Sequence, residues 1–235
     1  MGPNCRGSLM AIPRVGVILS GCGVFDGAEI HESVVTLLAL DRAGAEIVCM
    51  APDMAQANVV NHLTGNVAPG ETRNVLVEAA RIARGAIVDM RTIDPSTLDA
   101  LILPGGFGAA KNLCNFAVEG PGCTAHPEVA RVVRGVHAAS RPIGAMCIAP
   151  AVLATLLGNE HPDVTIGTDE KTATGLTAMG AHHIDCGVTG IVVDRRLRLV
   201  STPAYMLAGS ISEAAKGIEA LVAEVLRLVA MGSDT

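Results

Sequence analysis

Residues 144–153 read GAMCIAPAVL, an apolar run that ends in a cysteine, passes through small residues and a proline, and becomes helix-like. This order is typical of a strand that turns sharply into a helix, with the thiol of Cys147 at the corner. Small neighbours suit the strained backbone of such a turn, and Pro150 suits a first helical turn, where its missing N–H needs no partner. We therefore expect the start of this helix to stabilise a Cys147 thiolate.

Before and after this stretch, apolar runs alternate with helix-like patterns along most of the chain. The apolar runs lie at 15–19, 46–51, 101–103, 142–146 and 191–193. The helix-like patterns lie at 32–43, 73–84, 127–139, 148–157 and 210–229. This alternation predicts an α/β protein with a mainly parallel sheet that helices cover on both faces.

The length and composition suit one domain with an aliphatic core. Half of the 235 residues are hydrophobic but only 2% are aromatic. We expect a single domain over residues 14–231 and take residues 1–13 as a flexible leader or a cloning remnant. Two stretches rich in Gly, Pro, Asn and Thr, residues 52–72 and 109–127, are interpreted as insertions that shape access or build a subunit contact.

A glycine-rich stretch, LPGGFGAAKNL at residues 103–113, follows one of the apolar runs. Consecutive glycines after a strand let backbone N–H groups point into a shared site. Together with the N–H of Ile148, donors near Gly105 and Gly106 would form an oxyanion hole beside Cys147. The alternative is a plain tight turn. Phosphate binding is disfavoured because neither GxGxxG nor a GK[ST] ending is present.

An acidic cluster follows the apolar run at 15–19 and contains Asp26, Glu29, His31 and Glu32. In a parallel sheet, the carboxyl ends of the strands are where sites form. A carboxylate in contact with a Cys147 thiolate should have a raised pKa and carry the proton that the two groups share. The alternative is that all four residues are charges at a helix start that face water.

Several stretches resemble the ThiJ/PfpI family of the class I glutamine amidotransferase-like superfamily. They span about residues 14–230 and read GVILSGCGVFDGAEIHE, APD, NHLTG, ETRNVLVEAARIARG, LPGGFGAAKNL, MCIAPA, IGTD and TPAYMLA. Within the family, they are most similar to members linked to isoprenoid biosynthesis. The resemblance implies a flavodoxin-like, three-layer sandwich, and relatives are commonly homodimers.

The resemblance also implies roles for individual residues. Cys147 matches the family's nucleophile, and Glu32 matches the carboxylate that contacts its sulfur. Gly106 and Ile148 match the backbone donors. Glu29, near Glu32, is a further candidate.

One expected residue is missing from this pattern. Many relatives carry a histidine some twenty residues after the cysteine, where this chain reads TIGTDE. Thr168 or Asp169 occupies that place, and His183 is a candidate substitute. A complete triad of cysteine, histidine and acid is therefore not expected.

Two functions from different classes fit these residues. The first is a cofactor-independent glyoxalase-type lyase, linked to isoprenoid metabolism. It would convert a small aldehyde or dicarbonyl, such as glyoxal to glycolate, through a hemithioacetal on Cys147. The second is a non-catalytic, redox-sensitive thiol or an accessory protein of metabolism. Glutamine amidotransfer is disfavoured because the only H-P-E sequence, which starts at His126, precedes the cysteine.

Charge and cysteine usage exclude several partners. The formal net charge of −6 speaks against nucleic acids and anionic membranes as partners, and no apolar run approaches the ~18 residues that span a bilayer.

The seven cysteines have no CxxC spacing, so we expect neither a disulfide framework nor a metal site, and no cofactor. A reducing compartment fits, and we expect the cytoplasm.

Overall fold

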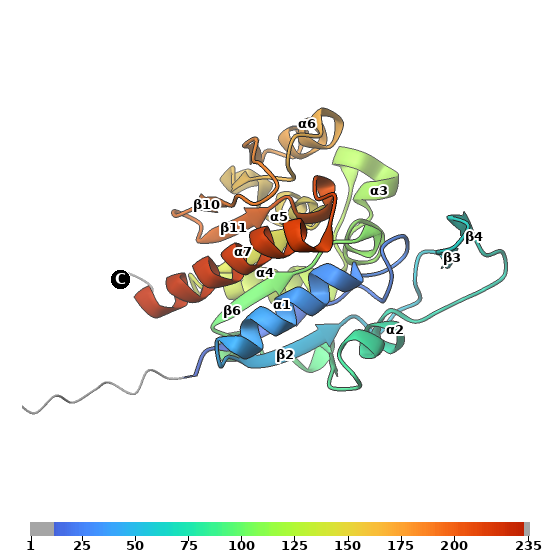
Figure 1. Ribbon diagram of the computed structural model, residues 1–235, viewed down its shortest axis with the longest axis horizontal. Coiled ribbons are helices and arrows are strands. Elements are labelled where there is room, and N and C mark those ends of the chain that lie inside the picture. The colour runs from blue at the N-terminus through green and yellow to red at the C-terminus, as the bar shows by residue number, and fades with distance from the viewer. Residues whose placement is uncertain (1–11, 233–235) are drawn as a thin grey trace, which may run out of the picture.

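One central β-sheet organises residues 12–232, the part of the chain that the computed structural model describes (Figure 1). Its strand order is β10-β11-β7-β6-β1-β2-β5. Every neighbouring pair runs parallel except β10 and β11, which are antiparallel. The strands are β1 (Arg14–Ile18), β2 (Glu46–Ala51), β5 (Val88–Asp89), β6 (Ala100–Leu103), β7 (Ile143–Met146), β10 (Val192–Asp194) and β11 (Leu199–Thr202).

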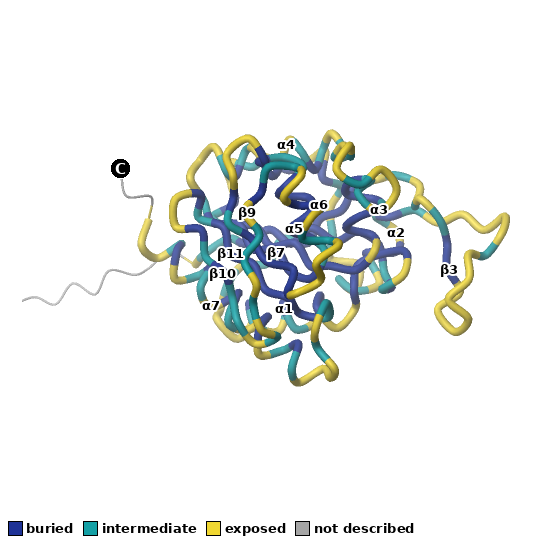
Figure 2. Tube along the Cα trace, turned by 90° about the horizontal axis from the view of Figure 1, so that it is seen from above, coloured by how far each residue is buried: buried dark blue, intermediate teal, exposed yellow. Residues whose placement is uncertain are grey.

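Helices cover both faces of this sheet, so the three-layer α/β fold predicted from the sequence is confirmed. α1 (Ile30–Arg42), α2 (Val75–Ile82) and α7 (Ile211–Met231) pack on one face, and α1 and α7 lie in front of the strands in Figure 1. α4 (Pro127–Ala138) and α5 (Pro150–Leu157) pack on the other face. Strands in the middle of the sheet, such as β7, are buried and appear dark blue in Figure 2.

Apolar side chains explain this layering. The strands β6 and β7 are buried at every position because helices lie on both of their sides. α4 directs Val129, Val132, Val133 and Val136 toward the sheet, the spacing of one helical face. Valine, leucine, isoleucine, alanine and methionine therefore build the core, as the low aromatic content requires.

Several short elements escaped the sequence patterns. β11 and α6 (Glu170–Ala178) were not predicted, and neither were the paired strands β8 (Asp163–Val164) and β9 (His182–His183). β11 reads LVST after a charged turn, so it has only two apolar residues in a row and does not stand out as an apolar run. All described helices and strands fall between Arg14 and Met231, and residues 1–11 of the expected leader lie outside the described part.

The first of the two interpreted insertions projects from the body of the molecule, whereas the second begins in the core, where Ala109, Leu113 and Cys114 are buried. Residues 52–72 include the hairpin of β3 (Val60–Asn61) and β4 (Asn66–Val67), which projects from the body of the molecule (Figure 1). Residues 109–127 include a turn of π-helix, Ala109–Leu113, and the short α3 (Phe116–Glu119).

The topology brings four loops to one edge of the sheet. β11, β7, β6 and β1 are neighbours and run parallel to one another, so their carboxyl ends meet there. In parallel α/β sheets this edge is where ligands bind. Each of these four strands leads into a residue of the candidate site.

Candidate active site

Cys147 stands at the sharp turn between β7 and α5. Its φ is +57°, a left-handed conformation that residues other than glycine seldom adopt. Its backbone N–H donates to the Thr202 carbonyl of β11 at 3.0 Å, which fixes the turn to the neighbouring strand. Only 8% of the residue is exposed. Strain of this kind, held by its surroundings, is characteristic of a nucleophile elbow.

The glycine loop after β6 packs directly against Cys147. A Cβ atom placed on Gly105 would lie 2.5 Å from the Cys147 Cβ and 2.8 Å from Oε2 of Glu32, so only glycine fits there. Gly106 has a φ of +88° and turns the backbone toward the cysteine. The backbone N–H groups of Gly106 and Ile148 lie close enough to the Cys147 sulfur to lower the pKa of its thiol. The two amides therefore form a cradle around the sulfur.

Glu32 lies in the first turn of α1 and is fully buried. Its Oε2 accepts a hydrogen bond from the Gly105 N–H at 2.8 Å, and its Oε1 accepts one from the Tyr205 N–H at 3.2 Å. The Cys147 thiol lies close enough to the Glu32 carboxyl for each group to shift the pKa of the other. Both oxygens are therefore held by backbone donors while the carboxylate faces the thiol.

Burial controls the protonation of this pair. It raises the pKa of Glu32 to about 7, and the nearby Glu29 carboxylate adds to the rise, against the hydrogen bonds from Tyr205 and Gly105. Burial, with the negative charge of Glu32, also raises the pKa of Cys147 well above its ordinary value. Burial therefore opposes the thiolate expected at the helix start, whereas the two amide donors favour it.

Glu29 and His31, the neighbours of Glu32 in sequence, have different positions. Glu29 caps α1, since its buried carboxylate accepts a hydrogen bond from the Glu32 N–H at 2.7 Å. His31 is exposed, and its Nδ1 lies 2.8 Å from the Tyr205 hydroxyl. Tyr205 was not singled out from the sequence, although the stretch TPAYMLA that contains it belongs to the family resemblance.

The candidates for the missing third residue make structural contacts. Asp169 is exposed and caps α6 by accepting a hydrogen bond from the Thr172 N–H at 2.8 Å. Thr168 is also exposed. His183 lies in β9, where its Nε2 accepts a hydrogen bond from the Ile166 N–H at 3.3 Å. Its side chain is largely buried, and burial lowers its pKa. These contacts account for Asp169 and His183 without a role at the thiol.

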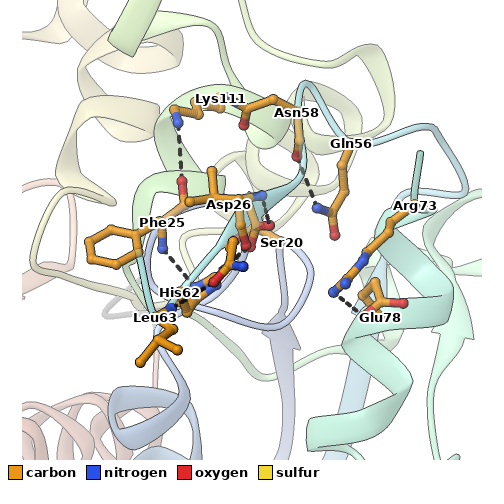
Figure 3. A network of polar contacts seen from close by, with 12 residues as sticks. Ser20, Phe25, Asp26, Gln56, Asn58, His62, Leu63, Arg73, Glu78 and Lys111 are labelled. Carbon is orange, nitrogen blue, oxygen red and sulfur yellow. Dashed lines mark hydrogen bonds and ion pairs between the residues drawn. The ribbon is translucent and has the colours of Figure 1, made fainter. Parts of the chain in front are cut away.

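Asp26 belongs to a separate polar network that secures the projecting hairpin (Figure 3). Its Oδ2 accepts a hydrogen bond from the Val60 N–H at 2.8 Å, and its Oδ1 lies 3.8 Å from Nε2 of His62. That same imidazole nitrogen accepts a hydrogen bond from the Phe25 N–H at 3.2 Å. The three acids that the sequence groups together therefore have different roles. Glu32 lies at the site, Glu29 caps α1 and Asp26 anchors a loop.

A buried cysteine at a strained turn, a carboxylate and an amide cradle on an α/β sandwich define a class of protein that includes enzymes with a cysteine nucleophile. The model of the DJ-1/PfpI family matches residues 22–202, and the chain belongs to this family. The predicted family membership is thereby confirmed.

Curated and solved relatives agree with this membership. The human glutamine amidotransferase-like class 1 domain-containing protein 3, mitochondrial, is 43% identical and is matched over 96% of this chain and 89% of its own length. The rat ES1 protein homolog, mitochondrial, is 44% identical over 92% of this chain and 84% of its own. A crystal structure of an isoprenoid biosynthesis protein with an amidotransferase-like domain from Ehrlichia chaffeensis is 39% identical, with a TM-score of 0.84, over 91% of this chain and 99% of that one.

The predicted cytoplasmic location is wrong, because the matched curated relatives are named as mitochondrial proteins. The prediction rested on cysteine usage. The six cysteines of the described residues are unpaired, and cysteine usage does not distinguish one reducing compartment from another.

Two further properties concern residues 12–232 alone. None of their helices is long and apolar enough to cross a membrane. No group of three or more His, Cys, Asp or Glu among them is arranged to hold a metal ion.

Proposed function

We propose that the protein is a cofactor-independent, glyoxalase-type enzyme that converts small dicarbonyl compounds into 2-hydroxy acids, for example glyoxal into glycolate. The observation that carries the proposal is the buried pair of Cys147 and Glu32 inside a cradle of backbone N–H groups. This arrangement supplies a nucleophile, a proton carrier and oxyanion donors, which are the groups that this reaction needs.

The first step is addition of sulfur to an aldehyde carbon. The ionised Glu32 takes the thiol proton as the Cys147 sulfur forms a bond to the carbon, and the carbonyl π electrons move onto oxygen. The N–H groups of Gly106 and Ile148 stabilise this oxyanion. Glu32 then returns the proton to the oxygen, which gives a neutral hemithioacetal.

The next steps move one proton between carbons and release the product. Glu32 removes the hydrogen of the hemithioacetal carbon, and the resulting enediol accepts a proton at the adjacent carbon, which gives a thioester of Cys147. Water then adds to the thioester carbonyl, and the sulfur leaves with a proton from Glu32. The products are a 2-hydroxy acid and the regenerated thiol, with no net oxidation.

The charge of the site favours uncharged substrates. Glu32 brings its carboxylate close to the sulfur and has the Glu29 carboxylate beside it, and within residues 12–232 neither makes an ion pair or hydrogen bond with Lys or Arg. An anionic substrate would be repelled at short range without a compensating cation. Small neutral dicarbonyls therefore suit the site.

The decisive experiment replaces the nucleophile. Cys147→Ala should abolish glyoxal consumption and glycolate formation, both followed by proton NMR on purified protein. Cys49→Ala is the matched control, because Cys49 is also a buried, unpaired cysteine but lies in β2. Unchanged turnover in Cys147→Ala would refute the proposal.

A second candidate function is a redox-sensitive thiol or an accessory role in metabolism. The same cradle of N–H groups favours it, because these donors would also stabilise the oxygen of an oxidised Cys147 sulfur. Titration with peroxide followed by mass spectrometry separates the two functions. Selective oxidation of Cys147 without measurable aldehyde turnover would support this candidate.

We also propose that the protein forms a homodimer through α1. Ile30, Val34 and Leu38 are exposed at a spacing of four residues, so they form an apolar stripe along the helix that carries Glu32. Val34→Glu should convert the dimer into a monomer in light scattering. A monomeric wild-type protein would exclude this assembly.

The names of the relatives extend the proposal to a cellular setting. We place the protein in mitochondria, as its curated relatives are named, and link it to isoprenoid metabolism, as the Ehrlichia protein is titled. Subcellular fractionation tests the first part. Isoprenoid levels in cells that lack the protein test the second.

A further inference from the structure

Tyr205 and His31 form a side-chain contact next to the buried pair. Tyr205 is the only tyrosine of the chain and lies in the short 3-10 helix Ala204–Met206 that follows β11. Its hydroxyl lies 2.8 Å from Nδ1 of His31, and the two rings lie 5.7 Å apart at an angle of 45°. His31 directly precedes Glu32 on α1, so this contact joins the loop after β11 to the helix that carries the carboxylate.

The backbone of Tyr205 contacts Glu32 directly. The Tyr205 N–H donates to Oε1 at 3.2 Å, a longer hydrogen bond than that of 2.8 Å from the Gly105 N–H to Oε2. The preceding residue, Ala204, has a φ of +44°, so the turn that presents this N–H is strained. A strained turn needs support from outside the turn to keep its geometry, and the bond between Tyr205 and His31 supplies such support.

From these contacts we propose that Tyr205 and His31 are positioning residues for Glu32. Their side-chain hydrogen bond fixes the turn at Ala204 against α1 and so keeps the Tyr205 N–H on Oε1. The carboxylate is then held by one donor on each oxygen and faces the Cys147 thiol. This inference rests on the proposed function for its catalytic consequence, but its structural part does not.

Loss of the contact between Tyr205 and His31 should raise the pKa of Glu32. The hydrogen bond from the Tyr205 N–H lowers the pKa of Glu32, against the dominant effect of burial. The titratable groups beside Glu32 are Glu29 at the cap of its helix, Cys147 at the elbow and Tyr205 after β11, whose hydroxyl contacts His31. None of them replaces the lost donor, so a weaker bond from Tyr205 leaves Glu32 protonated to a higher pH.

The test compares variants that remove or preserve the side-chain bond. Tyr205→Phe and His31→Ala remove it, whereas His31→Asn keeps a polar atom near the position of Nδ1. The main readout is the pH dependence of Cys147 alkylation by iodoacetamide, measured by mass spectrometry, because the charge of Glu32 acts on the thiol. Thermal unfolding checks that each variant is folded.

We expect Tyr205→Phe and His31→Ala each to move the midpoint assigned to Glu32 upward by about half a pH unit, a roughly threefold change in its proton equilibrium. The double variant should move it no further, and His31→Asn should restore part of the shift. If glyoxal is turned over, kcat should fall in the same variants with KM nearly unchanged.

The matched control is His182→Ala. Its Nδ1 also lies 2.8 Å from a partner, Oδ1 of Asp163, but in the small sheet of β8 and β9. Unshifted alkylation profiles in Tyr205→Phe and His31→Ala, or an equal shift in His182→Ala, would overturn the positioning role. Shifted profiles in a protein that does not consume glyoxal would refute the proposed function and leave the positioning role intact.

Discussion

Gly105 and Cys147 approach each other so closely that a methyl group on the glycine would lie 2.5 Å from the Cys147 Cβ. The same methyl group would lie 2.8 Å from Oε2 of Glu32, which accepts the Gly105 N–H. One glycine thus sets the distance between the nucleophile and its carboxylate. Side chains of any size are excluded where β6 meets the elbow.

Gly105→Ala should therefore separate the pair. The added methyl group must push Cys147 or Glu32 away, which costs about 1–3 kcal/mol in stability as an overpacked core does. We expect loss of glyoxal turnover and a lower midpoint in urea unfolding. Gly122→Ala is the control, because no atom lies within 4 Å of the corresponding methyl group. If Gly105→Ala were active and as stable as the wild type, the glycine loop would accommodate the methyl group without cost, which would contradict this prediction.

Glu32→Gln should make the Cys147 thiol react faster with an alkylating reagent but should slow the turnover of glyoxal. The carboxylate raises the pKa of Cys147 through its charge and through the hydrogen bond that it accepts, so its removal lowers that pKa. Alkylation at pH 8 should become faster, by about tenfold for each unit of pKa. Turnover should fall by about 10² or more because the proton carrier is lost.

Glu78→Gln provides the comparison for this prediction, since Glu78 is also a buried carboxylate but pairs with Arg81 on α2. It should leave both measurements near their wild-type values. Slower alkylation in Glu32→Gln would mean that Glu32 stabilises the thiolate by donating a proton to it, contrary to the electrostatics described above.

Stability should also depend on pH through Glu32. Burial raises its pKa from 4.5 to about 7, so the folded state holds a proton that the unfolded state loses in this range. The contribution to stability is complete below pH 4.5 and is lost as the pH rises through 7, by about 3 kcal/mol in total. Urea unfolding at pH 5 and pH 8 measures it. In Glu32→Gln the difference between the two pH values should shrink by a similar amount, and an unchanged difference would contradict the assignment.

Much of this site could be predicted from local sequence because its main parts are backbone features. The sharp turn at Cys147 and the glycine loop need particular small residues in a fixed order, and such an order is visible in a sequence. The carboxylate that contacts the thiol could not be identified from local sequence in this way. Glu29 and Glu32 are both acids at a helix start, and the residues alone could not separate them, because the helix phase decides which one points inward and which one caps.

Other parts depend on long-range packing that no local pattern reports. β11 has only two consecutive apolar residues and was not recognised, so Tyr205, just beyond its end, was not placed beside Glu32. The burial of Cys147 is another such property. A helix start favours a thiolate, whereas the burial that opposes it depends on packing that the local sequence does not show.

Replacement of Asp169 and His183 should affect stability without changing the thiol. Asp169→Ala removes the cap of α6 and should lower the free energy of unfolding by about 1 kcal/mol. His183→Gln alters the acceptor of the Ile166 N–H and should have an effect of similar size. The alkylation profile of Cys147 should match that of the wild type in both variants. A shifted profile in His183→Gln would restore this histidine as a candidate third residue.

Substrate charge offers the last test, because it probes the site without altering the protein. 4,5-Dioxopentanoate and its methyl ester have the same reactive dicarbonyl group, but only the free acid carries a carboxylate that would be repelled by Glu32. With Coulomb repulsion of about 1 kcal/mol or more at short range, kcat/KM for the free acid should be at least about fivefold lower than for the ester. The discrimination should weaken as the pH falls below the pKa of Glu32 near 7, since the carboxyl group is then neutral. Parallel kinetics at pH 6 and pH 8 measure this, and equal use of both compounds at pH 8 would show that the substrate does not approach the carboxylates.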